Sequence, residues 1–390
     1  MASQAPLLTP DSGPADVLIL AGEHSGDQHA ARVVRELQQK QPDVSVAALG
    51  GPQLKKAGAQ LLFDLPAHSV VGLVEVLKHY GFFKQLFDET LAWIERNRPK
   101  VVVLVDYPGF NLRLAKQLKE RGLSRQGGGE IAVYFYISPQ IWAWKAHRRF
   151  TMAEQLDELG VIFPFEIETY ADTRLPVKFV GHPFVEPDYV WPVRYEAGAP
   201  VLLLPGSRRQ PVQRIFPMLA ATAEAAVRQD PSRRFTVIYA EDSLKALMQE
   251  MLARHPGLEG KLDFVESGEP VAGSAVLTSS GTMSLACALA GLPGAILYRA
   301  HPLTYWIGRR VVKIPYLGMM NLILKREMYP EFIQEQARVS RLVRELEALQ
   351  SPERVQQTQR DAEELRATLT QERGDSAADR ICALMSSTQR

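Results

Sequence analysis

Pro205-Gly206-Ser207-Arg208 follows directly on the apolar run Val201–Leu204, and Ser280-Gly281-Thr282 follows shortly after the apolar run Ala275–Leu277. A helix-like segment comes after each of these glycine-containing turns. In an open α/β sheet, such turns lie at the carboxyl edge of the strands, where ligands bind. Both turns therefore direct backbone N–H groups and a helix N-terminus toward one crevice, which suits a diphosphate.

The same pattern of strand, small-residue loop and helix covers most of the chain and predicts an α/β protein with parallel sheets. The strands expected in the first half are Val17–Ala21, Val44–Leu49, Val101–Val105, Ala132–Ile137, Gly160–Phe163 and Val177–Val180. The strands expected in the second half are Val201–Leu204, Arg234–Tyr239, Phe264–Glu266, Ala275–Leu277 and Gly294–Tyr298. Between them, Glu186–Pro200 is predicted to be a linker.

These halves predict two Rossmann-like domains and a helical tail. We expect a first domain over residues 1–190, a second over residues 191–335, and C-terminal helices over residues 336–390. The tail is polar and carries Leu or Val at helical spacing, which is typical of helices with solvated outer faces.

The composition excludes several classes of protein. Among 390 residues, 45 Lys and Arg balance 44 Asp and Glu, so a broad nucleic-acid-binding face is not expected. Two cysteines form no disulfide framework and fit a reducing compartment. The N-terminus lacks the basic region of a signal peptide, and no apolar stretch reaches the length of a membrane span. We therefore expect a cytoplasmic protein.

Polar residues follow the first and third strands of the first half. Gly22-Glu23-His24-Ser25-Gly26-Asp27 comes after Val17–Ala21, and Asp106 ends Val101–Val105. An aspartate at the carboxyl edge of a parallel strand points into the crevice, where it can act as a general base. The alternative for both segments is an ordinary turn in which these residues cap the next helix. The first loop is not Gly-x-Gly-x-x-Gly, so dinucleotide binding is not indicated.

Three further stretches are candidates for binding. Trp142 and Trp144 lie near several cations and could line an acceptor site, or be core residues under a basic helix. Arg208 suits phosphate oxygens because its guanidinium is a planar fork; the alternative is a surface arginine. Tyr298–Lys313 mixes aromatic and aliphatic residues with cations, which suits an anionic membrane surface or an acyl-phosphate substrate. The alternative is an amphipathic helix packed in the second domain. A lone histidine, such as His182, is more often structural than catalytic. The absence of His-x-x-x-His, Cys-x-x-Cys and Asp-x-Asp predicts no catalytic metal.

Taken together, the motifs resemble those of the lipid-A-disaccharide synthase family, in the family's order and over most of the chain. The motifs are Ala21-Gly22-Glu23-His24-Ser25-Gly26-Asp27, Val105-Asp106-Tyr107-Pro108-Gly109-Phe110-Asn111, Ser138-Pro139-Gln140-Ile141-Trp142-Ala143-Trp144, Leu204-Pro205-Gly206-Ser207-Arg208 and Ser280-Gly281-Thr282. Val71–Leu77, Asn321-Leu322 and Arg326-Glu327 agree more weakly.

The resemblance implies a GT-B fold, in which two Rossmann-like domains face a cleft and C-terminal helices return to the N-terminal domain. It implies an inverting transfer of 2,3-diacylglucosamine from its UDP derivative to 2,3-diacylglucosamine 1-phosphate, which gives the β(1→6) disaccharide 1-phosphate and UDP. No cofactor is implied. It is also compatible with a peripheral position at the inner face of the cytoplasmic membrane and with a homodimer that exchanges C-terminal helices.

The resemblance also assigns roles to residues. The catalytic base is Asp106, with Glu23 in reserve. The substrate-binding residues are Ser25, Gly26, Asp27, Asn111 and Trp142, and the UDP-binding residues are Gly206, Ser207, Arg208, Ser280, Gly281, Thr282 and Asn321.

Two positions depart from the family, which commonly has Glu where this chain has Pro211 and Ala286. Because a carboxylate in this region binds the nucleotide ribose in related enzymes, the donor contact is altered here, and Glu241 or Glu327 could replace it. Two other functions stay open. One is a different GT-B sugar-nucleotide enzyme, such as a UDP-sugar epimerase or another transferase. The other is a non-catalytic nucleotide-sugar or lipid-binding relative.

Overall fold

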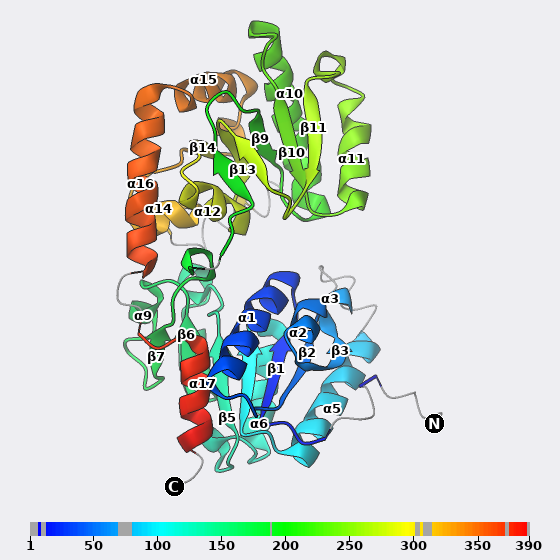
Figure 1. The fold of residues 1–390 in the computed structure, drawn as a ribbon, viewed down its shortest axis with the longest axis vertical. Coiled ribbons are helices and arrows are strands. Elements are labelled where there is room, and N and C mark those ends of the chain that lie inside the picture. Colours follow the sequence, from blue (N-terminus) through cyan, green and yellow to red (C-terminus); the bar gives the residue numbers. More distant parts are fainter. Residues whose placement is uncertain are drawn as a thin grey trace. The chain divides into compact units, whose positions relative to one another are not determined.

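The computed structural model describes residues 7–8, 13–68, 80–187, 189–300, 305–306, 314–370 and 374–387. The chain divides into two compact units, each built around a parallel sheet (Figure 1). One unit comprises Met1–Pro183 together with Glu372–Arg390, and the other comprises Phe184–Gln371. The α/β class with two parallel sheets is therefore confirmed.

The sheet of the first unit has the strand order β3-β2-β1-β4-β5-β6-β7 in the described part of the chain, and neighbouring strands are parallel. The strands are β1 Val17–Ala21, β2 Val46–Gly50, β3 Gln60–Asp64, β4 Val101–Val105, β5 Ala132–Tyr136, β6 Glu158–Val161 and β7 Val177–Phe179. Every residue of β1, β4 and β5 is buried, because helices cover both faces of the sheet.

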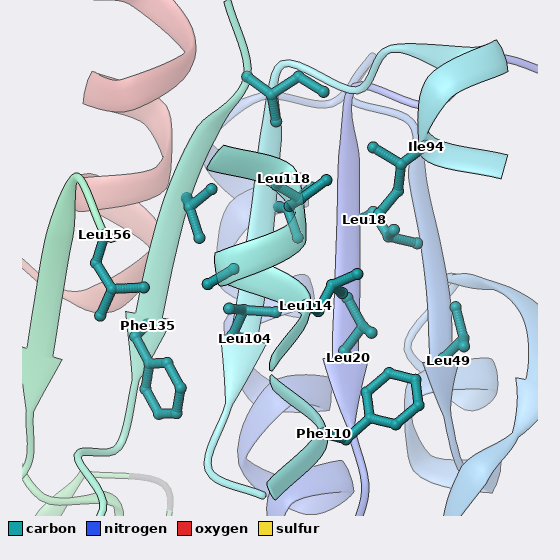
Figure 2. Packing of buried hydrophobic residues seen from close by; sticks show 14 of the residues in the cluster. Leu18, Leu20, Leu49, Ile94, Leu104, Phe110, Leu114, Leu118, Phe135 and Leu156 are labelled. Atoms are coloured by element: carbon teal, nitrogen blue, oxygen red, sulfur yellow. The ribbon is translucent and has the colours of Figure 1, made fainter. Parts of the chain in front are cut away.

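The helices of this unit form two layers. They are α1 His24–Lys40, α2 Pro52–Lys56, α3 Leu65–His68, α5 Tyr80–Asn97, α6 Pro108–Glu120, α7 Ile141–Trp144, α8 Arg148–Ala153, α9 Glu166–Thr169 and α17 Ala377–Ser386, with a 3₁₀ turn at Arg125–Gly127. In α6, Phe110, Leu114 and Leu118 recur every four residues and pack on Leu18 and Leu104 of the sheet (Figure 2). The final helix α17 lies against α1, β4 and β5, so the end of the chain returns to the first unit.

The second unit repeats this plan with the strand order β11-β10-β9-β13-β14-β15. Its strands are β9 Val201–Leu204, β10 Phe235–Tyr239, β11 Leu262–Glu266, β13 Val276–Ser279, β14 Gly294–Tyr298 and β15 Glu331–Ile333. A separate two-stranded sheet joins β8 Val193–Tyr195 to β12 Val271–Gly273. The segment predicted as a linker therefore contains a strand.

The helices of the second unit include two that follow its last strand. They are α10 Arg209–Gln229, α11 Asp242–Leu252, α12 Thr282–Leu289, α14 Met319–Leu324, α15 Val339–Leu349 and α16 Pro352–Thr370, with 3₁₀ turns at Pro256–Leu258 and Gln334–Gln336. A further 3₁₀ turn, Pro183–Val185, spans the boundary between the units. Helix α15 packs on α10, and α16 packs on α12 and α14.

Both sheets have a topological switch point, where the chain leaves one half of the sheet and starts the other. In the first sheet the switch point lies between β1 and β4, and in the second it lies between β9 and β13. Ligands of open α/β sheets bind outside the carboxyl ends of the strands at such points. The segments that follow these four strands are the ones that the sequence singles out: 22–27, 106–111, 205–208 and 280–282.

Candidate active site

At the switch point of the first unit, Gly22 and Tyr107 are in close contact. A Cβ atom at position 22 would overlap the ring of Tyr107, so only glycine leaves room for the ring. Burial raises the pKa of Tyr107, and the negative charge of Glu23, the N-cap residue of α1, adds to this effect. Glycine is therefore required here by a close approach of two loops.

Asp106 lies in a strained segment of backbone. Its φ is 45°, that of Tyr107 is 48°, and that of Ile137 at the end of the adjacent strand β5 is 66°. Left-handed conformations of non-glycine residues cost energy, and they concentrate at functional sites. The backbone N–H of Asp106 donates to the carbonyl of Tyr136 at 3.0 Å, which ties the two strand ends together.

The side chain of Asn111 is hydrogen-bonded to this strained segment. Its side-chain amide donates to the carbonyl of Asp106 at 2.7 Å and to that of Val105 at 3.3 Å. The residue is fully buried in α6. The structure therefore places the side chain of Asn111 against the backbone of Asp106.

Trp142, which follows β5, is held by a residue that the sequence analysis missed. Its indole N–H donates to Glu166 Oε1 at 3.3 Å, and its ring packs edge-on against Phe165 at 5.2 Å between centroids. Glu166 is 1% exposed, and burial raises its pKa to about 8, with a further contribution from the charge of Asp106. The available signal was a carboxylate shortly after an expected strand, the same signal that pointed to Asp106. By contrast, Trp144 is half exposed, with Lys145 over its ring.

The remaining predicted residues of the first unit differ in their surroundings. Ser25 is exposed in the first turn of α1, whereas Gly26 is buried against Ala21 and Val105. Asp27 is 1% exposed, and its two carboxylate oxygens accept backbone N–H groups from Gly51, Gln53 and Leu54. Asp27 thus caps the helix α2 and connects the loop to the neighbouring strand end.

In the second unit, the predicted turns line one pocket at the carboxyl ends of β9, β10 and β13. Five of the seven predicted UDP-binding residues contribute to its wall, namely Gly206, Ser207, Ser280, Gly281 and Thr282. Gly206 has a φ of 114°, which favours glycine, and α12 begins at Thr282 with its N-terminus at the pocket. The described lining residues carry no charged side chain.

Arg208 and Asn321 do not line this pocket. Arg208 is exposed at the N-cap of α10, next to the pocket residue Ser207. Asn321 is fully buried. Its side-chain amide donates to the carbonyl of Tyr329 and to Glu331, and its side-chain oxygen accepts the backbone N–H groups of Met328 and Tyr329.

Glu331 is a second residue that the sequence analysis missed. Its carboxylate accepts the backbone N–H groups of Leu317 and Gly318, and the carbonyl of Leu317 accepts the hydroxyl of Ser280 at 3.2 Å. Asn321 and Glu331 therefore fix the loop that contacts the second turn of the pocket.

The two departures from the family pattern lie in the helices that follow the two turns of this pocket. Pro211 is in the first turn of α10 and packs near Gly206, where its missing N–H costs no helical hydrogen bond. Ala286 is fully buried in α12. Of the two proposed replacements, Glu241 occupies the N-cap position of α11 directly after the pocket residue Ala240, and Glu327 is exposed after α14.

Two predicted segments fall largely or wholly outside the described residues. Val71–Leu77 is not described, and of Tyr298–Lys313 only 298–300, 305 and 306 are; Trp306 is 57% exposed. In the part of the chain that is described, no helix has the length and apolarity needed to cross a membrane. Over the same residues, no three His, Cys, Asp or Glu side chains gather where they could bind a metal ion.

Known proteins resemble this chain along nearly its whole length. The family model described as lipid-A-disaccharide synthetase matches residues 17–384. Lipid-A-disaccharide synthase 1 of Legionella pneumophila is 36% identical over 331 residues, which cover 82% of this chain and 83% of that protein. The lipid-A-disaccharide synthase of Geobacter sulfurreducens is 36% identical over 343 residues, with coverages of 85% and 86%.

Solved structures of low sequence identity share the fold. The UDP-GlcNAc 2-epimerase from Neisseria meningitidis bound to UDP-GlcNAc aligns with a TM-score of 0.58 at 11% identity and covers 94% of this chain and 98% of its own. The glycotransferase of kitacinnamycin aligns with a TM-score of 0.60 at 13% identity, with coverages of 95% and 99%. These likenesses confirm the predicted GT-B fold. The family match and the relatives above 30% identity go further, and by them the chain belongs to the lipid-A-disaccharide synthetase family.

Proposed function

We propose that this protein transfers 2,3-diacylglucosamine from its UDP derivative to the 6-hydroxyl of 2,3-diacylglucosamine 1-phosphate, with inversion at the anomeric carbon. Family membership supports the reaction, and the placement of Asp106 at the switch point of the first sheet is the observation that carries the mechanism. The first unit binds the acceptor and takes its proton, and the second unit binds the UDP donor.

The reaction breaks one bond and forms another at the same carbon. The C1–O bond to the diphosphate breaks, and its electron pair leaves with UDP. The acceptor 6-oxygen forms the new C1–O bond from the opposite face, and its proton passes to the carboxylate of Asp106. A base positioned for such a transfer contributes about 10²–10⁴-fold to the rate. Glu23 is the reserve base, since it also follows a strand at the switch point.

In the second unit, the leaving diphosphate needs positive charge and N–H donors. The N-terminus of α12 at Thr282 and the turn at Gly206 and Ser207 supply the donors, and exposed Arg208 supplies the charge. Asn321 contributes by fixing the loop at Leu317 through Glu331, so its role is one of support for Ser280.

In the first unit, the remaining assigned residues divide into contact and support. Ser25 is exposed and is proposed to contact the acceptor, and Trp142 is proposed to border its sugar. Gly26 lets α1 approach Val105, while Asp27 and Asn111 hold the loops in which Glu23 and Asp106 lie.

The substrates carry acyl chains, so we propose that the enzyme works at the inner face of the cytoplasmic membrane as a peripheral protein, and as a homodimer. The cations and aromatic residues of Tyr298–Lys313 support the first point. Flotation of the purified protein with anionic vesicles, and its mass in solution, test the two points separately.

Release of UDP tests the reaction. Incubation with both acylated substrates should release UDP in step with the disaccharide, and neither should form when the acceptor is omitted. Release of UDP or conversion of the donor to its epimer without acceptor would instead favour the epimerase reading. A chelator should leave the rate unchanged if Arg208 and backbone N–H groups bear the diphosphate charge; loss of activity with chelator contradicts that part.

A further inference from the structure

Glu166 is a buried carboxyl group to which the reaction as proposed above assigns no role. It lies in the turn after β6, while Trp142 follows β5 and Asp106 follows β4. These three strands are neighbours in the sheet, and the carboxyl ends of neighbouring parallel strands meet at one edge. Glu166 is 1% exposed, in hydrogen-bond contact with Trp142 and within electrostatic reach of Asp106.

We propose that Glu166 is a positioning residue for the proton transfer at Asp106, acting by fixing the indole ring of Trp142 at the acceptor side of this edge. The proposal rests on the proposed function, because it takes Asp106 as the base. The indole is held at two places, by its N–H at Glu166 and by its edge-on contact with Phe165. Glu166 itself is held by the backbone N–H of Phe163 at 3.2 Å, so the support is fixed to the turn.

The charge state of Glu166 matters because a second negative charge beside Asp106 would oppose the first. Burial raises the pKa of Glu166 to about 8, so that the carboxyl is neutral near pH 7. Tyr170 faces Glu166 from the end of α9, donates or accepts at Ser138, and stays protonated because burial raises its pKa. His182 lies across the ring of Phe163 and is neutral, because burial lowers its pKa to about 3. Burial is thus the main reason that Glu166 stays neutral, and the charge of Asp106 adds to it.

Fluorine NMR tests the contact without any substrate. In protein labelled with 5-fluorotryptophan, the Trp142 resonance is assigned by comparison with Trp142→Phe. That resonance should shift with a midpoint near pH 8 in the wild type. It should not shift in Glu166→Gln, which is isosteric but cannot ionise. A wild-type Trp142 resonance that is independent of pH, or one that titrates equally in Glu166→Gln, overturns the proposal.

Kinetics separate positioning from a general structural role. Glu166→Ala frees the indole, and kcat should fall by about 10²-fold, with the KM for the UDP donor nearly unchanged. Glu166→Gln keeps an acceptor for the indole N–H and should recover most of the lost kcat. The matched control is Glu168→Gln, an exposed acid on the same helix, which should behave as the wild type.

One further variant keeps failure of this inference distinct from failure of the proposed function. If Asp106→Asn retains full activity, the proposed mechanism fails, whatever Glu166 does. If Asp106→Asn is slow while Glu166→Ala turns over at the wild-type rate, the role of Asp106 stands and the positioning role of Glu166 is overturned. Should Glu166→Ala not fold, the resonance of Trp142 and the kcat of Glu166→Gln still decide the question.

Discussion

The two switch points use the same topology in opposite ways. At the switch point of the first unit, bulky and ionisable side chains lie together. Tyr107 covers Gly22, and Asp106 is held in a left-handed conformation. Glu166 is buried and accepts a hydrogen bond from Trp142. At that of the second unit, the described pocket wall is made of small and uncharged residues with a helix N-terminus. The difference teaches that the sheet provides only a location. A site that moves a proton needs side chains held in place, whereas a site that binds a diphosphate can rely on backbone N–H groups.

The largest effect should come from the base of the first unit. Asp106→Asn keeps the size of the side chain and tolerates a positive φ, but it cannot take the acceptor proton. Disaccharide formation should fall by about 10²–10⁴-fold, with the thermal unfolding midpoint unchanged. Asp43→Asn, a change at an exposed aspartate, is the control. Turnover at the wild-type rate would remove Asp106 from the mechanism and leave the contrast between the units without its chemical basis.

Arg208→Ala tests the second unit in the same assay. Losing a charged hydrogen bond to phosphate costs roughly 1.5–3 kcal/mol, so kcat/KM for the donor should fall by about 10–10²-fold. Binding of UDP should weaken in parallel, while acceptor binding is unaffected. Arg254→Ala, at an exposed arginine of the same unit, should leave UDP affinity as it is. Unchanged UDP affinity in Arg208→Ala would mean that backbone groups alone bind the diphosphate.

Packing at the first switch point can be tested apart from catalysis. Gly22→Ala places a methyl group into the ring of Tyr107 and should lower the free energy of unfolding by about 1–3 kcal/mol. Tyr107→Ala in the same chain should recover part of that loss, because the clash is removed. Gly109→Ala is the control: it meets open space in α6 and should be neutral or stabilising by about 0.5–1 kcal/mol. Equal effects of the two glycine substitutions would contradict the close approach.

Two histidines of the first unit, buried His182 and half-buried His29, predict a dependence of stability on pH. Burial lowers the pKa of His29 to about 4 and that of His182 to about 3. The native state keeps them neutral while the unfolded chain protonates them below about 6.5, so their stabilising contribution is present above pH 6.5 and is lost as the pH falls toward those values. Each contributes a slope of up to about 1.4 kcal/mol per pH unit. Urea unfolding at pH 7 and pH 5 should show a smaller loss in His182→Gln, and the wild-type loss in exposed His147→Gln.

The sequence predicted the elements that have a strong local pattern. Apolar runs such as Val101–Val105 and Val201–Leu204 are continuous and end at small or acidic residues, so their positions and the α/β class could be inferred. The GT-B fold was predicted from the resemblance to the family. The strands β3, β8, β12 and β15 were missed, and the last three have only three residues each, which gives a periodic pattern little room to stand out. In such strands the partner strand decides the structure, and a partner distant in sequence leaves no local mark.

The candidate residues show the same limit. The sequence located Asp106, Gly206 and Thr282 because they follow strong strands, but it did not show which polar residues face inward. Asn321 was expected at the nucleotide and is buried beneath a loop, while Glu166 and Glu331 were missed. Hydrogen bonds between separate segments of the chain, such as the one that the backbone N–H of Leu317 donates to Glu331, are products of the fold and have no signature in a single sequence.

The return of α17 to the first unit has a consequence for synthesis. The first unit is discontinuous, since Phe184–Gln371 are inserted before its last helix. Arg380 of α17 forms a bidentate ion pair with Glu158, in which two guanidinium nitrogens each donate to a carboxylate oxygen at 2.6 Å. Glu158 is 4% exposed. During synthesis, the inserted unit can therefore fold before α17 has been made. The sheet of the first unit gains the ion-pair partner of Glu158 only when α17 follows. Chains that end after α16 would contain Glu158 buried without its ion-pair partner, and we expect quality-control proteases to degrade them.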